Sequence, residues 1–156
     1  MDKTCRIAKE QYDTFSSMLS YCFKHLRNLE EENPQNTLYF DKIRKDCEKL
    51  CIVYRKRMME KFYKVYGGPT PFDEPIDDVK LYPDTCWECL EEYRILENIY
   101  HYSIQYLVTF FMDTAEAAIS YTDILEDCQK AYQEYQKEIQ KRIEEILQNI
   151  QEGTKP

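Results

Sequence analysis

Three cysteines occur at spacings that could bring their thiols into one site. Cys47 and Cys51 are one helical turn apart, and Cys128 repeats the setting of Cys47 further along the chain. Thiolate sulfur is the ligand that soft ions such as copper(I) and zinc prefer. If facing helices hold these thiols at one depth, with Cys22 beside them, they form a soft-metal or thiol-redox site. The alternative is structural, because a free cysteine also packs well in a protein core.

Glu97 and His101 are the second candidate pair. They lie four residues apart, so on a helix they share one face and could ligate one ion. The only other histidine is His25, so the sequence does not predict a histidine-rich site. The alternative is a polar pair beside the apolar face of the helix.

Residues 86–89 form a Cys-x-x-Cys motif at the expected start of a helix. A helix N-terminus lowers the pKa of a thiol, which would suit a redox or metal role. The motif lacks the preceding strand of thioredoxin-type proteins and the second Cys-x-x-Cys pair of a zinc site. We therefore expect Trp87 and Cys89 to pack the end of a helical bundle.

The cysteine segments belong to an internal repeat. Residues 46–56 and 127–137 share the pattern Asp-Cys-x-Lys-x-x-x-x-Tyr-x-Lys, at an offset of 128 − 47 = 81. The same offset places Tyr12 on Tyr93 and Tyr21 on Tyr102. We interpret the chain as two related helix pairs.

Apolar residues recur at alternating spacings of three and four, which predicts four amphipathic helices at about 3–31, 38–66, 84–112 and 114–151. Pro34 ends the first helix, and Gly67 can cap the second in the left-handed conformation. Asn36 or Thr37, and later Asp84 or Thr85, can cap the helices that follow. The predicted apolar seams are Ala8, Tyr12, Phe15, Leu19, Cys22, Leu26 and Leu29; Phe40, Ile43, Cys47, Leu50, Tyr54, Met58, Phe62 and Val65; Cys89, Tyr93, Leu96, Tyr100, Ser103, Leu107 and Phe110; and Ile119, Ile124, Cys128, Ala131, Tyr135, Ile139, Ile143 and Ile146.

Loop lengths indicate the topology. Short links pair the first helix with the second and the third with the fourth as antiparallel hairpins. Residues 67–83 are rich in proline and acidic residues and are long enough to cross lengthwise between the hairpins. We therefore predict an all-α fold: one domain over residues 1–156, a four-helix bundle of two hairpins joined by a long crossover.

Composition excludes several classes of function. The net charge is −8, whereas nucleic acids and anionic membranes are bound by basic surfaces. No N-terminal stretch resembles a signal peptide, and no run is apolar enough to span a bilayer. The seven cysteines are an odd number, which argues against a disulfide framework. We expect a cytoplasmic protein that binds neither nucleic acid nor membrane.

Two helix hairpins, an internal duplication and a long crossover resemble the ferritin-like superfamily, especially the rubrerythrin-type proteins. That resemblance implies a di-iron centre built from a Glu on the first helix of each pair and Glu-x-x-His on the second. Glu97 matches one first-helix Glu, and its counterpart is Ser16. The other four ligand positions are occupied by Cys47, Leu50, Cys128 and Ala131. The resemblance therefore implies a shared fold whose di-iron site is lost.

These observations favour a non-enzymatic ferritin-like bundle that acts as a binding or scaffold protein, with a homodimer as one form. The partner protein is not predicted. No catalytic or phosphate-binding motif is recognisable. The alternative is a copper- or zinc-binding or thiol-redox protein that uses Cys47, Cys51, Cys128 and Glu97. A third interpretation is a helical adaptor unrelated to ferritins.

Overall fold

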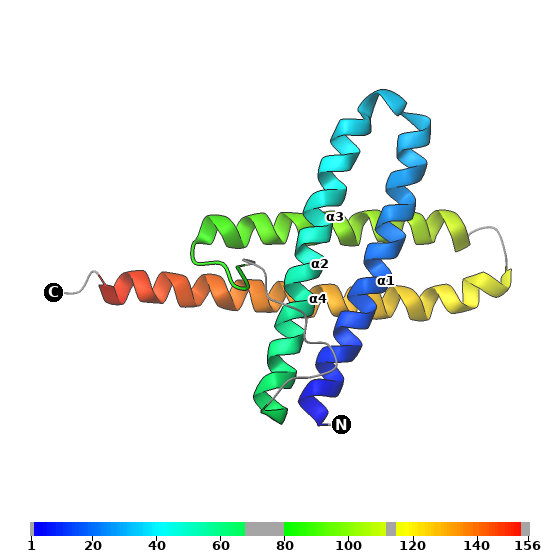
Figure 1. Cartoon of the computed structure of the whole chain (residues 1–156). Coiled ribbons are helices and arrows are strands. Elements are labelled where there is room, and N and C mark those ends of the chain that lie inside the picture. Colours follow the sequence, from blue (N-terminus) through cyan, green and yellow to red (C-terminus); the bar gives the residue numbers. More distant parts are fainter. Residues whose placement is uncertain (1, 68–79, 112–114, 154–156) are drawn as a thin grey trace.

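The structure is a computed structural model that describes residues 2–67, 80–111 and 115–153 (Figure 1). Its elements are α1 (Lys3–Glu32), the short 3₁₀ helix η1 (Pro34–Asn36), α2 (Thr37–Tyr66), α3 (Cys86–Phe111) and α4 (Ala115–Gly153). No strand occurs in these three ranges. The predicted all-α class is therefore confirmed, and the helix bounds differ from the expected ones by at most two residues. Most of the predicted crossover, residues 68–79, lies outside the described residues.

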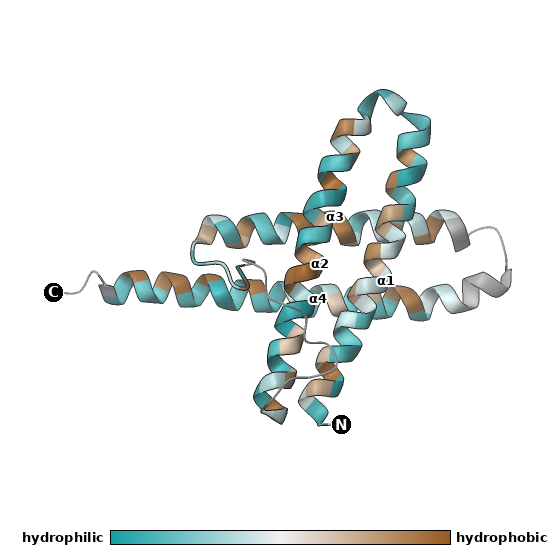
Figure 2. Cartoon of the chain, viewed as in Figure 1, coloured by the Kyte–Doolittle hydropathy of each residue, from teal (hydrophilic) through white to brown (hydrophobic). Residues whose placement is uncertain are grey.

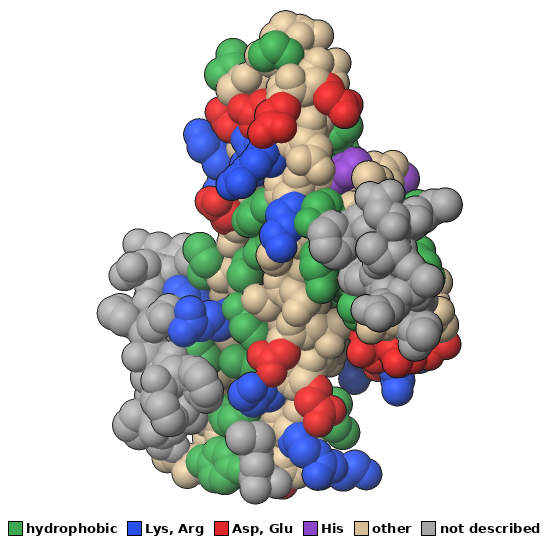
Figure 3. Space-filling model, turned by 90° about the vertical axis from the view of Figure 1, so that its right-hand side faces the viewer, with side chains coloured by type: hydrophobic (Ala, Val, Ile, Leu, Met, Phe, Trp, Pro, Cys, Tyr) green, Lys and Arg blue, Asp and Glu red, His purple; other side chains and the backbone are tan. Residues whose placement is uncertain are grey.

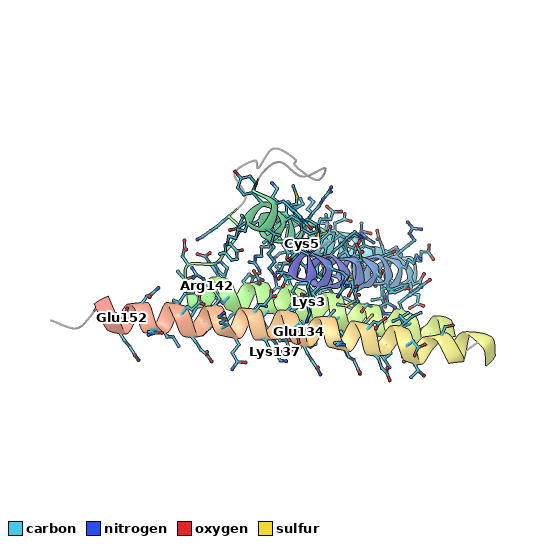
Figure 4. All side chains as sticks on the ribbon, turned by 90° about the horizontal axis from the view of Figure 1, so that it is seen from below. Lys3, Cys5, Glu134, Lys137, Arg142 and Glu152 are labelled. Carbon is cyan, nitrogen blue, oxygen red and sulfur yellow. The ribbon has the colours of Figure 1, made fainter. Side chains whose placement is uncertain are left out.

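α1 and α2 lie side by side and run in opposite directions (Figure 1). At one end of this pair the Asp2 amide donates to the Tyr66 hydroxyl at 2.9 Å. At the other end Arg44 pairs with Glu30. α3 and α4 form a second antiparallel pair, and the two pairs cross as two layers (Figures 1 and 4). Because the pairs cross, their ends extend beyond the shared core.

The core lies at this crossing. Figure 2 shows hydrophobic positions recurring along each helix between polar ones, as the seam spacing predicts. The fully buried side chains on α1 and α3, which face each other across the layers, are Phe15, Met18, Cys22, Leu26, Leu96, Ile99, Ser103 and Leu107. Most other seam residues are also buried. Val65 is an exception: it is 42% exposed, since the last turn of α2 lies beyond the crossing.

Local hydrogen bonds explain where the helices start and stop. The Asp2 carboxylate caps α1 by accepting from the Thr4 amide at 2.8 Å. Gly67 ends α2 with φ +69°, as predicted, and its amide donates to the Tyr63 carbonyl at 2.7 Å. Thr85 caps α3, because its hydroxyl accepts from the Glu88 amide at 3.1 Å. The expected side-chain cap at Asn36 or Thr37 was wrong, because η1 precedes α2 and the Thr37 hydroxyl donates back to Pro34.

Two arginines, one from each layer, hold the segment that precedes α3. Arg57 on α2 donates to the Leu81 carbonyl at 2.6 Å and pairs with Glu92 through both ends of its guanidinium group. Arg142 on α4 donates to the Pro83 carbonyl at 2.8 Å. The backbone at residues 81–83 is therefore held from both layers.

Within the part of the chain that the structure describes, none of the helices combines the length and the apolar character needed to cross a bilayer.

Candidate functional site

The structure places the predicted metal-ligating residues in different surroundings. Cys47 and Cys128 are buried on α2 and α4, at 0% and 1% exposure. Cys51 is half-buried, and its sulfur lies 3.6 Å from the Tyr12 hydroxyl. Glu97 is exposed on α3. Glu97 therefore faces solvent, whereas Cys47 and Cys128 lie in the core.

One pair of thiols does come together. Cys22 on α1 hydrogen-bonds Cys47 on α2 in the middle of the core. Cys128 lies instead beside Tyr21 and Tyr100. Across residues 2–67, 80–111 and 115–153, no three His, Cys, Asp or Glu side chains gather into a group that could hold a metal ion.

The buried thiols are held in the protonated form. The hydrogen bond to Cys47, together with burial, raises the pKa of Cys22 far above its ordinary value. Burial, with a smaller effect of Asp127, raises the pKa of Cys128 to about 11. Since the thiolate is the reactive form, these two cysteines are poor nucleophiles at neutral pH.

The two histidines, 76 residues apart in sequence, lie next to each other on the surface where α1 meets α3 (Figure 3). Their rings flank Tyr102, at 5.9 Å for His25 and 5.7 Å for His101 between ring centroids. Gln105 hydrogen-bonds both rings, with 2.8 Å between its Nε2 and the Nε2 of His101. Burial lowers the pKa of His25. Sequence spacing pairs His101 with Glu97 and gave no signal for this contact.

The Cys-x-x-Cys motif lies on the first turn of α3, as expected. Cys89 is buried and Cys86 half-buried, and burial raises the pKa of Cys89. The prediction that Trp87 packs the bundle end was wrong, because its side chain is 77% exposed. Cys89 takes the inward face of that turn, so Trp87, two residues earlier, points outward.

An exposed apolar strip surrounds Trp87 and is the surface that sequence reasoning missed. We call it the Trp87 face; it consists of the exposed Trp87, Leu90, Leu147 and Ile150 and the partly buried Ile143. Leu90 on α3 and Ile143 on α4 line a shared groove of about 450 Å³, whose other walls include Tyr93 and Gln136. Leu147 and Ile150 continue the strip along α4, at 47% and 57% exposure. The signal was present in the sequence, because residues 143, 147 and 150 repeat a four-three spacing beside the buried stripe.

Lysine and glutamate side chains lie along α4 beside the Trp87 face. Lys137 and Lys141 lie on the part of α4 nearer the crossing, and Glu144 and Glu152 lie towards its C-terminal end. Figure 4 shows Lys137 pointing away from the α1–α2 layer and Glu152 at the projecting end of α4. Glu138, Arg142 and Glu145 lie on the same stretch of α4, so basic and acidic side chains are interspersed along it.

Comparison of the chain with protein-family models, with curated proteins and with solved structures found no match. The ferritin-like relationship stays a prediction.

Proposed function

We propose that this protein is a non-enzymatic helical scaffold that pairs with a second copy of itself through the Trp87 face. The observation that carries the proposal is the set of exposed large apolar side chains on two adjacent helices, beside the groove that Leu90 and Ile143 line and at an end that projects beyond the crossing. Exposed apolar patches mark interaction sites on soluble proteins.

Energetics support a dimer. Burying a large apolar side chain contributes about 1.5–3 kcal/mol, and each copy offers Trp87, Leu90, Leu147 and Ile150. Both copies contribute, so the gain can exceed an association cost of about 4–15 kcal/mol. In an antiparallel copy, Lys137 of one chain, which lines the groove, would approach Glu144 of the other.

Leu147→Asp tests this proposal, with Leu38→Asp as the matched control. Leu38 is also an exposed leucine, at 87%, but lies at the start of α2 away from the Trp87 face. We expect the native chain and Leu38→Asp to dimerise with a Kd of about 1–10 μM in sedimentation equilibrium, and Leu147→Asp to be monomeric. Trp87 is the only tryptophan, so its fluorescence should shift to the blue on dimerisation. A native chain that is monomeric at the highest concentrations would overturn the proposal.

We propose further that the chain is a duplication of one helix hairpin at an offset of 81, with the hairpins joined by a crossover. Equivalent contacts support this. Tyr12 contacts Cys51 in one pair, and Tyr93 contacts Tyr132 at the equivalent positions of the other. The equivalent residues Tyr54 and Tyr135 stack on each other with centroids 4.2 Å apart, as expected beside a pseudo-twofold axis.

Burial follows the same offset. Four of the five fully buried residues of α1 (Phe15, Met18, Cys22 and Leu26) have fully buried counterparts on α3 (Leu96, Ile99, Ser103 and Leu107), whereas the fifth, Cys5, corresponds to the half-buried Cys86. We keep a ferritin-like ancestry as a proposal on this basis. A cytoplasmic location also remains a proposal, which the seven free cysteines support.

Copper(I) or zinc binding is the second candidate function, and the contact between Cys22 and Cys47 favours it. Two thiolates suffice for a soft ion, which would displace both protons. Competition titration with copper(I) should show binding that is lost in a Cys22→Ala, Cys47→Ala variant and kept in Cys5→Ala. Equal binding by the two variants would remove this candidate.

A further inference from the structure

A groove of about 630 Å³ runs between α1 and α4, on the stretch of α4 that α1 crosses (Figure 4). Its lining includes four acidic residues, Glu10, Asp13, Asp127 and Glu134, and one basic residue, Lys130. Ile7, which is half exposed, supplies apolar surface beside these carboxylates, and the small, buried Ala131 also lines the groove. The groove therefore combines an apolar floor with a mainly acidic lining.

The chain neutralises this acidic lining only in part. Asp13 pairs with Lys9 at 2.7 Å, and Lys130 lines the groove. At the lower edge Glu134 lies 3.3 Å from Lys137. Glu10 and Asp127 have no ion pair within the described parts of the chain. Two carboxylates thus line the groove without a direct ion pair among the described residues, and Lys130 is the one basic residue in the groove lining.

The other helix pair shows how the equivalent positions are satisfied. Between α2 and α3, Arg94 lies 2.6 Å from Glu91 and 3.4 Å from Asp46. At the offset of 81, Glu91 corresponds to Glu10 and Asp46 to Asp127. The position of Arg94 corresponds to Asp13. Both acids are therefore retained on the α1–α4 side, and the arginine that bridges them is replaced by a third acid.

Two apolar positions of the α2–α3 side are occupied by smaller residues on the α1–α4 side. Leu50 and Ile95, on the α2–α3 side, correspond to Ala131 and Thr14 in the groove. Both replacements are smaller, and Ala131 and Thr14 line the hollow. The smaller side chains leave more room between α1 and α4, where the groove lies.

We propose that the α1–α4 groove binds an amphipathic segment of a protein partner that presents an arginine. Its guanidinium would lie between Glu10 and Asp127, as Arg94 lies between Glu91 and Asp46, and its apolar side chains would cover Ala131. A guanidinium group fits better than an ammonium group, because its planar fork can donate to two carboxylates at once. The inference rests on the equivalence of the two helix pairs and is independent of the Trp87 face.

The test uses the full chain and a fluorescein-labelled helical peptide with a leucine stripe and one central arginine. A matched peptide carries citrulline, which keeps the shape and removes the charge. By fluorescence anisotropy we expect the arginine peptide to bind at least about tenfold more tightly than the citrulline peptide.

Three protein variants locate the binding. Asp13→Arg supplies the chain's own guanidinium, and Ala131→Leu fills the floor without a charge change. Each should weaken binding of the arginine peptide by about tenfold or more. Asp13→Arg should also raise the unfolding midpoint, which shows that it folds. Glu48→Arg makes the same charge change on the exposed surface of α2 and should leave binding within about twofold of the native chain.

Several results would overturn the inference. Equal affinity for the arginine and citrulline peptides would mean that no guanidinium site exists. Equal losses in Asp13→Arg and Glu48→Arg would reduce the binding to overall charge. If Asp13→Arg instead changes the dimerisation equilibrium and leaves peptide binding unchanged, a second copy occupies the groove.

Discussion

Arg57 ties three parts of the chain together at a site that is largely closed to water. Its side chain is 12% exposed and that of Glu92 is 10% exposed. Its guanidinium lies over the rings of Tyr54 and Tyr82, at 5.3 Å and 5.0 Å. Arg57 also donates a hydrogen bond to the Leu81 carbonyl, in the segment before α3. Removal of Arg57 would leave the Glu92 carboxylate with little access to solvent and with only the Tyr54 hydroxyl, 3.5 Å away, as a partner.

We therefore predict that Arg57→Ala lowers the free energy of unfolding by about 3–5 kcal/mol, the range found when one member of a buried ion pair is removed. Arg94 offers a control, because its pair with Glu91 has both side chains about half exposed. Arg94→Ala should cost at most about 1 kcal/mol. Urea denaturation measures both. Similar losses of unfolding free energy in the two variants would show that burial does not make the Arg57 pair more stabilising than the exposed pair.

Cysteine reactivity should follow burial. Cys51 and Cys86 are partly exposed, whereas the other five cysteines are buried. Timed alkylation of the native chain, read by mass spectrometry, should modify Cys51 and Cys86 first. The remaining thiols should react at the rate of unfolding, because burial raises the pKa of Cys5, Cys89 and Cys128. Rapid native-state modification of Cys22 or Cys47 would favour the thiol-redox alternative.

At the scale of elements, the helices were predictable because each is long and has a regular seam. Pro34 and Gly67 mark chain reversal and helix termination through local backbone chemistry. The outward position of Trp87 was not predicted. A four-three pattern tells which residues share a face of a helix. At the start of α3, apolar residues lie on two faces, with Cys89 buried and Leu90 exposed, so the pattern does not tell which face is inward.

Gly67 provides a test of one helix end. Its φ of +69° is a left-handed conformation, and a Cβ added there meets nothing within 4 Å. The cost of Gly67→Ala should therefore come from the backbone alone, at about 1–2 kcal/mol. Gly67→Asn should cost less, since asparagine tolerates this conformation. Thermal unfolding of the two variants measures the difference, and an unchanged Gly67→Ala protein would mean that this end of α2 frays.

At the scale of the whole molecule, the crossing of the two pairs was beyond prediction. Spacing within a helix gives the direction of its apolar face but neither the crossing angle nor the depth of packing against another pair. The sequence therefore did not predict the contacts that depend on the crossing. These are the pair of Arg57 with Glu92, 35 residues apart, and the approach of His25 to His101. For the same reason Cys47 and Cys128, which occupy equivalent positions in two seams, do not form one metal-binding cluster with Cys51 in the described part of the chain.

The composition of the core predicts how stability depends on pH. Burial raises the pKa of the Cys128 thiol from 9.0 to about 11 and raises the pKa of Tyr54 and Tyr135 as well. The native state therefore keeps protons that the unfolded chain has released above pH 9, so stability falls as pH rises. For Cys128 the loss begins near its unfolded pKa of 9.0 and is complete above about 11.

We expect the urea midpoint to fall steeply between about pH 9 and 11, while the helical circular dichroism signal at zero urea persists into that range. Cys128→Ala removes one of the groups responsible, so its midpoint should fall less steeply over the same interval even if it starts lower. Cys51→Ala is the matched control, because Cys51 is only half-buried. A midpoint that stays level up to pH 11 would mean that the thiols and phenols of the core reach solvent in the native state, which the crossed packing of the two helix pairs does not allow.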